Sequence, residues 1–115
     1  MKKILVIDDE PMILSIIETY LGKKYDIKCF ECSKELISHL KSEGADLIIS
    51  DFYMPEISGE QLCEKVREIS NCPMILISGS VIESCKKEEF NAFLKKPFGP
   101  KELNKLVEEK MEKVA

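Results

Sequence analysis

The stretch Ile4-Leu5-Val6-Ile7-Asp8-Asp9, close to the start of the chain, decides the class of fold. A short apolar run that stops at acidic residues is typical of a strand that is buried on both faces. Similar runs return at Leu47-Ile48-Ile49 and at Met74-Ile75-Leu76-Ile77. Strands of this kind belong to a parallel sheet that is covered by helices on both sides.

Two weaker signals complete the sheet. Residues 25–30 place Lys28 between two apolar side chains, and this alternation predicts an edge strand with one face partly exposed to water. Ala92-Phe93-Leu94 is a shorter candidate for a fifth strand, and it ends at Lys95-Lys96-Pro97. We therefore expect five strands, of which three are buried in the middle of the sheet or next to it.

Apolar residues at helical spacing lie between the strands. We expect one helix to begin near Pro11 and end near Gly22, a second to be capped by Ser33, and the last to begin at Pro100. Residues 81–90 carry the weakest helical pattern, with two turns at most. The apolar stripes are Ile13, Ile16, Ile17, Tyr20 and Leu21; Leu36, Ile37 and Leu40; Leu62, Val66 and Ile69; and Leu103, Leu106, Val107 and Val114.

The predicted elements alternate between strand and helix along the whole chain. This order implies right-handed crossovers and a doubly wound α/β sheet, in which ligands bind at the carboxyl ends of the strands. The 115 residues contain no linker, repeat or low-complexity stretch. We therefore expect a single domain that spans residues 1–115.

The composition excludes several classes of protein. The chain has 17 Lys and Arg against 21 Asp and Glu, a net charge of −4, which argues against direct binding of nucleic acid. Its longest apolar runs have four residues, too few to span a membrane or to form a signal peptide. Five cysteines, an odd number, suit a reducing compartment. We expect a cytoplasmic protein that contacts no membrane.

Polar side chains follow four of the predicted strands. Carboxylates that meet in one site repel one another, by about 4 kcal/mol for a pair at ~4 Å and an effective dielectric constant of ~20. Mg²⁺, which prefers oxygen ligands, offsets this repulsion, and a lysine and a hydroxyl add the donors that a phosphoryl group needs. The candidate residues are, in chain order, Asp8, Asp9, Asp51, Ser78 and Lys96.

Each candidate taken alone has an ordinary structural explanation. An Asp at a strand end often caps the following helix, an alternative that is open for Asp9. A Ser after a strand often belongs to a turn, and a Lys before Pro often lies in a loop. The occurrence of acids, a hydroxyl and a lysine after separate strands of one fold favours a shared site.

The same residues resemble a known family. Four segments are similar to the receiver domain of two-component response regulators: Asp8-Asp9, Asp51-Phe52-Tyr53-Met54-Pro55-Glu56-Ile57-Ser58-Gly59, Ile77-Ser78-Gly79 and Phe93-Leu94-Lys95-Lys96-Pro97-Phe98. The likeness extends from residue 3 to about residue 111. It implies a flavodoxin-like fold, a three-layer sandwich whose parallel five-stranded sheet has the strand order 2-1-3-4-5.

The resemblance implies that Asp51 is the phosphoacceptor, which would take a phosphoryl group from a phosphohistidine and form an acyl phosphate. Lys96 would pair with one phosphoryl oxygen, and Ser78 would donate its hydroxyl to another. The peptide bond between Lys96 and Pro97 is expected to be cis. Such a domain catalyses only its own phosphorylation and dephosphorylation and is a signalling module, not an enzyme.

The resemblance also implies Mg²⁺ as the cofactor. Asp9 would bind the ion directly and Asp8 through a water molecule. Asp51 and the backbone carbonyl of Tyr53 would supply the other protein ligands. These assignments follow from the family and not from the spacing of the residues.

A switch is implied as well. Phosphorylation adds roughly −1.5 to −2 charge at Asp51, and this charge would draw in the Ser78 hydroxyl. Phe93 would then rotate inward and change the surface that binds a downstream protein. An aromatic residue that only fills the core explains Phe93 equally well.

We therefore expect a phosphoacceptor receiver with two kinds of partner: a sensor histidine kinase or histidine phosphotransfer protein, and a downstream effector protein. No DNA-binding segment follows the last predicted helix, so we expect a single-domain regulator or a part of a longer protein. One alternative is a Mg²⁺-dependent aspartyl phosphohydrolase, although such enzymes usually carry D-x-D on the first strand instead of adjacent Asp8-Asp9. The other is a receiver-like scaffold that binds partners without phosphorylation.

Overall fold

The computed structural model describes residues 1–79 and 92–112. Within these ranges, parallel strands form one sheet in the order β2-β1-β3-β4-β5. The strands are β1 (Lys3–Ile7), β2 (Asp26–Phe30), β3 (Leu47–Asp51), β4 (Met74–Ser78) and β5 (Ala92–Lys95). The helices are α1 (Pro11–Leu21), α2 (Ser33–Glu43), α3 (Gly59–Arg67) and α4 (Pro100–Glu112). The expected doubly wound fold and its strand order are confirmed.

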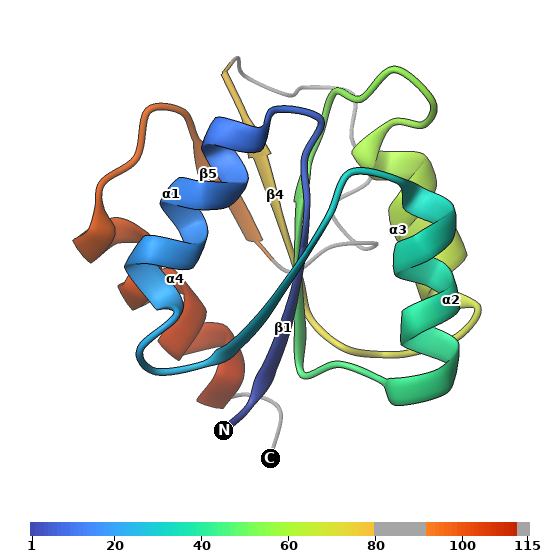
Figure 1. Ribbon diagram of the computed structural model, residues 1–115, viewed down its shortest axis with the longest axis horizontal. Helices are drawn as coiled ribbons and strands as arrows, with labels where there is room; N and C mark the ends of the chain where they lie inside the picture. Colours follow the sequence, from blue (N-terminus) through green and yellow to red (C-terminus); the bar gives the residue numbers. More distant parts are fainter. Residues whose placement is uncertain (80–91, 113–115) are drawn as a thin grey trace.

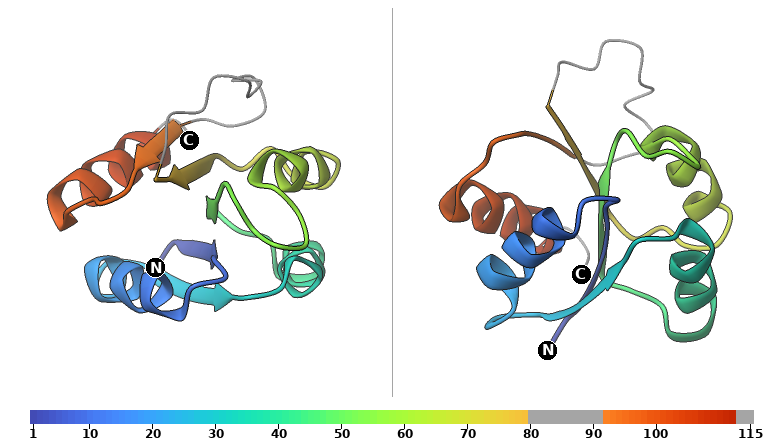
Figure 2. Two further views of the ribbon diagram at one scale, coloured as in Figure 1. Left: turned by 90° about the horizontal axis from the view of Figure 1, so that it is seen from above. Right: turned by 45° about the horizontal axis from the view of Figure 1, so that its top comes forward.

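The helices cover both faces of the sheet, with α1 and α4 on one side and α2 and α3 on the other (Figures 1 and 2). The side chains of β1 alternate between the two resulting cores. Ile4 and Val6 pack with the residues of α1 and α4, whereas Leu5 and Ile7 pack with those of α2 and α3. Because both faces of the sheet are covered, both faces of β1 are buried, and this is why Ile4, Leu5, Val6 and Ile7 are all apolar.

The expected edge strand is also confirmed. Among the strands that the structure describes, β2 pairs with β1 alone, and along β2 exposed residues alternate with less exposed ones before the buried Phe30. Lys28 is exposed, and Ile27 and Cys29 on either side of it are half-buried. The alternation in the sequence therefore reports the position of the strand in the sheet.

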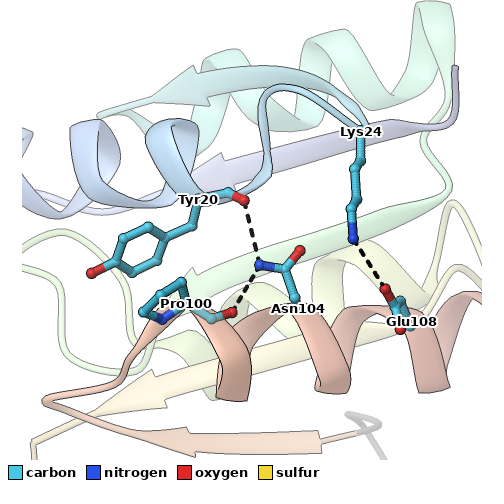
Figure 3. Close-up of polar contacts among 5 residues, drawn as sticks. All are labelled: Tyr20, Lys24, Pro100, Asn104 and Glu108. Atoms are coloured by element: carbon cyan, nitrogen blue, oxygen red, sulfur yellow. Dashed lines mark hydrogen bonds and ion pairs between the residues drawn. The ribbon is translucent and has the colours of Figure 1, made fainter.

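Polar contacts join α1 to α4 on their shared face of the sheet (Figure 3). The Asn104 side-chain amide donates to the backbone carbonyl of Tyr20, at 3.4 Å, and to that of Pro100, at 2.8 Å. Lys24 and Glu108 form an ion pair with an N–O distance of 3.4 Å. Since the carbonyls in the last turn of a helix lack partners within it, Asn104 stabilises the end of α1 as well as the pairing of the two helices.

The ends of the first two helices only partly follow the expectation. Pro11 begins α1, and the backbone N–H of Gly22 closes it by donating to the Glu18 carbonyl at 2.7 Å. The prediction that Ser33 caps α2 is wrong. Cys32 occupies the N-cap position with extended backbone angles, so helical geometry has already begun at Ser33, whose side chain makes no capping hydrogen bond.

A complete capping box begins α3. The Ser58 hydroxyl accepts a hydrogen bond from the Gln61 backbone N–H at 3.1 Å, and the Gln61 side chain accepts one from the Ser58 N–H at 3.0 Å. We expect Ser58→Ala to lower the free energy of unfolding, measured in urea, by about 1 kcal/mol. Ser33→Ala is the matched control and is expected to cost less; an equal loss would contradict the role of the cap.

The remaining helix expectations have mixed outcomes. Ile69 lies beyond the end of α3 but still packs against the core on that side. The helix expected at residues 81–90 and the position of Val114 lie outside the described residues. No helix in the described ranges is long and apolar enough to cross a membrane.

Candidate functional site

The carboxyl ends of four strands bring the candidate residues to one edge of the sheet. The register pairs Asp51 with Ile77 and Ser78 with Lys95, so β3, β4 and β5 end side by side. Two backbone hydrogen bonds extend the ladder beyond the strands, from the Phe52 N–H to Ile77 and from the Lys96 N–H to Ser78, both at 2.8 Å. The sheet thus fixes the main chain on which the site is built.

Lys96 lies between two buried carboxylates. Its Nζ is 3.6 Å from Asp8 Oδ2 and 3.6 Å from Asp51 Oδ1. The two carboxylate side chains are only 1% and 7% exposed, and that of Lys96 is 21% exposed. The peptide bond between Lys96 and Pro97 is cis, as expected. Three residues from separate parts of the chain therefore converge as the sequence predicted.

Asp9 adds a further carboxylate beside them, and Glu10 joins it. Within the described ranges, carboxylate oxygens of Asp8, Asp9 and Glu10 all lie within 4.8 Å of one another, whereas Asp51 is not part of this group. The N-cap of α1 is Glu10, with no side-chain cap, so Asp9 does not cap that helix. Glu10 was not among the predicted site residues, although its position directly after the two acids was an available signal.

Burial dominates the electrostatics of both carboxylates. It raises the pKa of Asp8 to about 6, against the opposing effect of the Glu10 backbone N–H, which donates to Asp8 Oδ1 at 2.8 Å. The charge of Asp51 raises the pKa of Asp8 further, and Lys96 lowers it. Burial also raises the pKa of Asp51, while Lys96 and the Tyr53 backbone N–H lower it. The pKa values of both carboxyl groups stay raised, so Lys96 alone does not offset the effect of burial on Asp8 and Asp51.

The residues present fit a hard divalent cation. Asp8 Oδ2 is buried and accepts no hydrogen bond from any residue that the structure describes, and Lys96 lies beyond hydrogen-bond distance of it. A buried anionic oxygen without a donor is costly unless a cation satisfies it. The carboxylates of Asp9 and Glu10 lie close to that of Asp8, and Mg²⁺ prefers oxygen ligands of this kind in proteins.

The other expected site residues lie on β4, on β5 and just after β3. Ser78 is fully buried at the end of β4. Tyr53 is 60% exposed, and its ring lies edge-on to that of Phe52, with 4.9 Å between the ring centroids. Its backbone N–H lowers the pKa of the Asp51 carboxyl. Phe93 is half-buried against the core on the side of α2 and α3. This position fits an aromatic residue of the core, and the rotation of Phe93 stays a prediction.

Gly59 allows α3 to begin directly against the end of β3. A Cβ atom at this position would lie 2.9 Å from the Asp51 carbonyl oxygen and 2.9 Å from Phe52 Cα, and neither backbone atom can move aside freely. We expect Gly59→Ala to lower the free energy of unfolding by about 1–3 kcal/mol, measured by urea denaturation. The matched control is Gly79→Ala, because a Cβ there meets no atom of the described residues within 4 Å. An equal effect of the two substitutions would contradict this role of Gly59.

The model of the response regulator receiver domain family matches residues 4–108. The chain belongs to this family. Its relatives include the "Probable transcriptional regulator ycf27" of Porphyridium aerugineum, 36% identical over 107 residues that cover 89% of this chain and 45% of that protein. The regulatory protein VanR of Enterococcus faecium is 32% identical over 106 residues, which cover 88% of this chain and 46% of VanR. This receiver domain therefore spans about half the length of the curated relatives it matches.

Solved receiver structures agree with the fold. The chemotaxis protein CheY4 of Vibrio cholerae superposes with a TM-score of 0.87 at 25% identity, covering 95% of this chain and 98% of CheY4. A response regulator receiver domain protein from Clostridium thermocellum superposes with a TM-score of 0.88 at 25% identity, covering 98% of this chain and 96% of that chain. The chain is thus a receiver domain of two-component response regulators, a signalling module.

Proposed function

We propose that this receiver domain accepts a phosphoryl group on Asp51 and passes on a signal by changing the surface that binds another protein. The observation that carries the proposal is the position of Lys96 Nζ, 3.6 Å from carboxylate oxygens of both Asp51 and Asp8. A nucleophilic carboxylate, a lysine beside it and an acidic cluster next to both are the groups that phosphoryl transfer to an aspartate requires.

The transfer step uses few groups of the protein. An Asp51 carboxylate oxygen attacks the phosphorus of a phosphohistidine, the new P–O bond forms, and the P–N bond breaks with its electron pair left on the imidazole. Lys96 pairs with a phosphoryl oxygen, and the Ser78 hydroxyl donates to another. Because the transfer needs mainly positioning and neutralisation of charge, the domain catalyses its own phosphorylation and dephosphorylation.

Mg²⁺ would be held by Asp8, Asp9 and Asp51 with the backbone carbonyl of Tyr53. When bound, it supplies the positive charge that the phosphoryl oxygens need in addition to Lys96. The unsatisfied, buried Asp8 Oδ2 supports this assignment. The exposed carboxylate of Glu10, close to those of Asp8 and Asp9, adds negative charge that attracts the ion.

The signal would leave the site through Ser78 and Phe93. The phosphoryl group draws in the Ser78 hydroxyl at the end of β4, and Phe93, one strand away on β5, turns inward. Phe93 is only half-buried, which supports a change that a partner can detect. A downstream effector protein would bind the altered surface.

The proposed partners follow from the family. A sensor histidine kinase or a histidine phosphotransfer protein supplies the phosphoryl group, and the setting is cytoplasmic. One sheet with two cores supports residues 1–115 as a single receiver domain. Since this chain has a net charge of −4, we propose no direct contact with nucleic acid.

One experiment separates this function from a phosphohydrolase and from a scaffold that needs no phosphorylation. The protein is incubated with Mg²⁺ and acetyl phosphate, its intact mass is followed, and Asp51→Asn is the matched control. A gain of one phosphoryl group by the wild type alone supports the receiver. Steady release of phosphate from many substrates would identify a hydrolase, and an unchanged mass with acetyl phosphate and with a phosphorylated kinase would identify a scaffold.

A further inference from the structure

Ser50 is a buried polar residue to which the proposed function gives no role. It is the residue before Asp51 on β3, it is 0% exposed, and its strand neighbours are Ile7 on β1 and Leu76 on β4. A hydroxyl among apolar side chains is costly unless it makes a hydrogen bond. Its hydroxyl donates to the backbone carbonyl of Asp51 at 2.9 Å.

This hydrogen bond holds one side of the peptide group between Asp51 and Phe52. On the other side, the Phe52 N–H donates to the Ile77 carbonyl at 2.8 Å. The next carbonyl, that of Phe52, accepts a hydrogen bond from the Gly59 N–H at 2.7 Å. The main chain on the C-terminal side of Asp51 is therefore held by three successive hydrogen bonds, and the Ser50 hydroxyl is the one side-chain group among their partners.

The same main chain orients the reacting carboxylate. The Tyr53 backbone N–H lowers the pKa of the Asp51 carboxyl, and a rotation of the preceding peptide groups would change the position of this N–H relative to the carboxylate. Ser50 lies on the face of β3 that Ile48 occupies, toward α2 and α3, because side chains alternate along a strand. It can therefore act on Asp51 only through the main chain.

We infer that Ser50 is a positioning residue for phosphoryl transfer, whose hydroxyl fixes the peptide group that orients the Asp51 carboxylate and the Tyr53 N–H. This inference rests on the proposed function. Small displacements of a reacting group can lower a rate strongly while the fold is kept. The hydroxyl and not the size of the side chain carries the effect.

The test compares Ser50→Ala, Ser50→Thr and Ile49→Val with the wild type. Ile49 is the matched control because it is a fully buried neighbour on the same strand, on the opposite face of the sheet. For each protein we would measure the initial rate of phosphoryl uptake from acetyl phosphate at saturating Mg²⁺, the dissociation constant for Mg²⁺, the melting temperature, and the amide NMR resonances of Phe52 and Tyr53.

Ser50→Ala is expected to lower the uptake rate about tenfold, to shift both amide resonances and to leave the Mg²⁺ dissociation constant unchanged. Ser50→Thr is expected to restore the rate and the resonances, and Ile49→Val to keep the wild-type rate despite a lower melting temperature. If Ser50→Thr does not fold, the uptake rate of Ser50→Ala is compared with that of Ile49→Val, and a loss of rate in Ser50→Ala alone supports the positioning role.

Two results would overturn the inference alone: labelling of Ser50→Ala at the wild-type rate, or an equal loss of rate in Ile49→Val. Failure of the wild type to take up any phosphoryl group would instead overturn the proposed function, and with it this role of Ser50. The amide resonances need no phosphorylation, so they report in every case whether the Ser50 hydroxyl holds the main chain around Asp51.

Discussion

Replacing Lys96 by alanine is expected to lower the rate of phosphoryl uptake from acetyl phosphate by about 10²–10³-fold, while Mg²⁺ binding stays largely intact. The Lys96 ammonium lies 3.6 Å from Asp51 Oδ1 and is the one cation that the described residues place beside both buried carboxylates. Without it, negative charge that develops on the phosphoryl oxygens loses a fixed positive partner. Mg²⁺ would still be held by the acids, because the lysine is not one of its ligands.

Lys95→Ala is the matched control for this loss. Lys95 is the preceding residue and has the same charge, but its side chain is exposed and makes no ion pair among the described residues. Uptake would be measured as the initial rate of mass gain and Mg²⁺ binding by calorimetric titration, for both variants and the wild type. Equal rates for the two variants would contradict the role of Lys96 in the transfer. Lys96→Ala, but not Lys95→Ala, should also impair signalling in a cell assay.

The stability of the metal-free protein is expected to fall as the pH rises from about 4 to about 6. The pKa of the Asp8 carboxyl is raised from 3.8 to about 6 in the folded state, so between these values the folded protein holds a proton that the unfolded chain has released. The stabilising contribution of the protonated Asp8 to the folded state is therefore fully present below pH 4 and is lost as the pH rises past 6. By proton linkage the loss amounts to about 3 kcal/mol. The raised pKa of Asp51 acts in the same direction.

Asp8→Asn isolates this effect from the other acids of the chain. Urea denaturation in EDTA would be measured from pH 4 to pH 7 for both proteins, and the difference between the two curves is the contribution of Asp8. We expect the variant to be more stable than the wild type at pH 7, and Mg²⁺ to restore stability to the wild type because it binds only the folded state. Parallel curves for the two proteins would show that burial of Asp8 does not govern the pH dependence.

The strands could be predicted from the sequence because burial on both faces leaves a direct mark, an apolar run that ends at a polar residue. The runs at Ile4 and Met74 gave β1 and β4, and the alternation around Lys28 gave the edge strand β2. The order of the strands came from the resemblance to receivers, since periodicity does not specify which strands pair. The cap of α2 was predicted wrongly because a Ser near a helix start does not reveal at which residue helical angles begin.

The site could be predicted as a set of residues but not as a set of contacts. Asp8, Asp51 and Lys96 follow different strands, and parallel strands end at one edge, so their convergence follows from the fold. The roles of Ser50 and Gly59 depend on the direction of single carbonyl groups, for which the sequence carries no periodic signal. Glu10 could have been predicted from the sequence, because it is a third acidic residue directly after Asp8 and Asp9, but it was not included among the site residues.

The location of the phosphoryl group is the most direct test of the site. After incubation with Mg²⁺ and acetyl phosphate, the protein is treated with borohydride, which reduces an aspartyl phosphate to homoserine, and its peptides are sequenced by mass spectrometry. We predict that the change occurs at Asp51, that it is absent from Asp51→Asn, and that Asp8 and Asp9 remain unmodified. A phosphoryl group on any other residue, or none on a protein that binds Mg²⁺, would contradict the convergence of Asp8, Asp51 and Lys96 as a phosphoacceptor site.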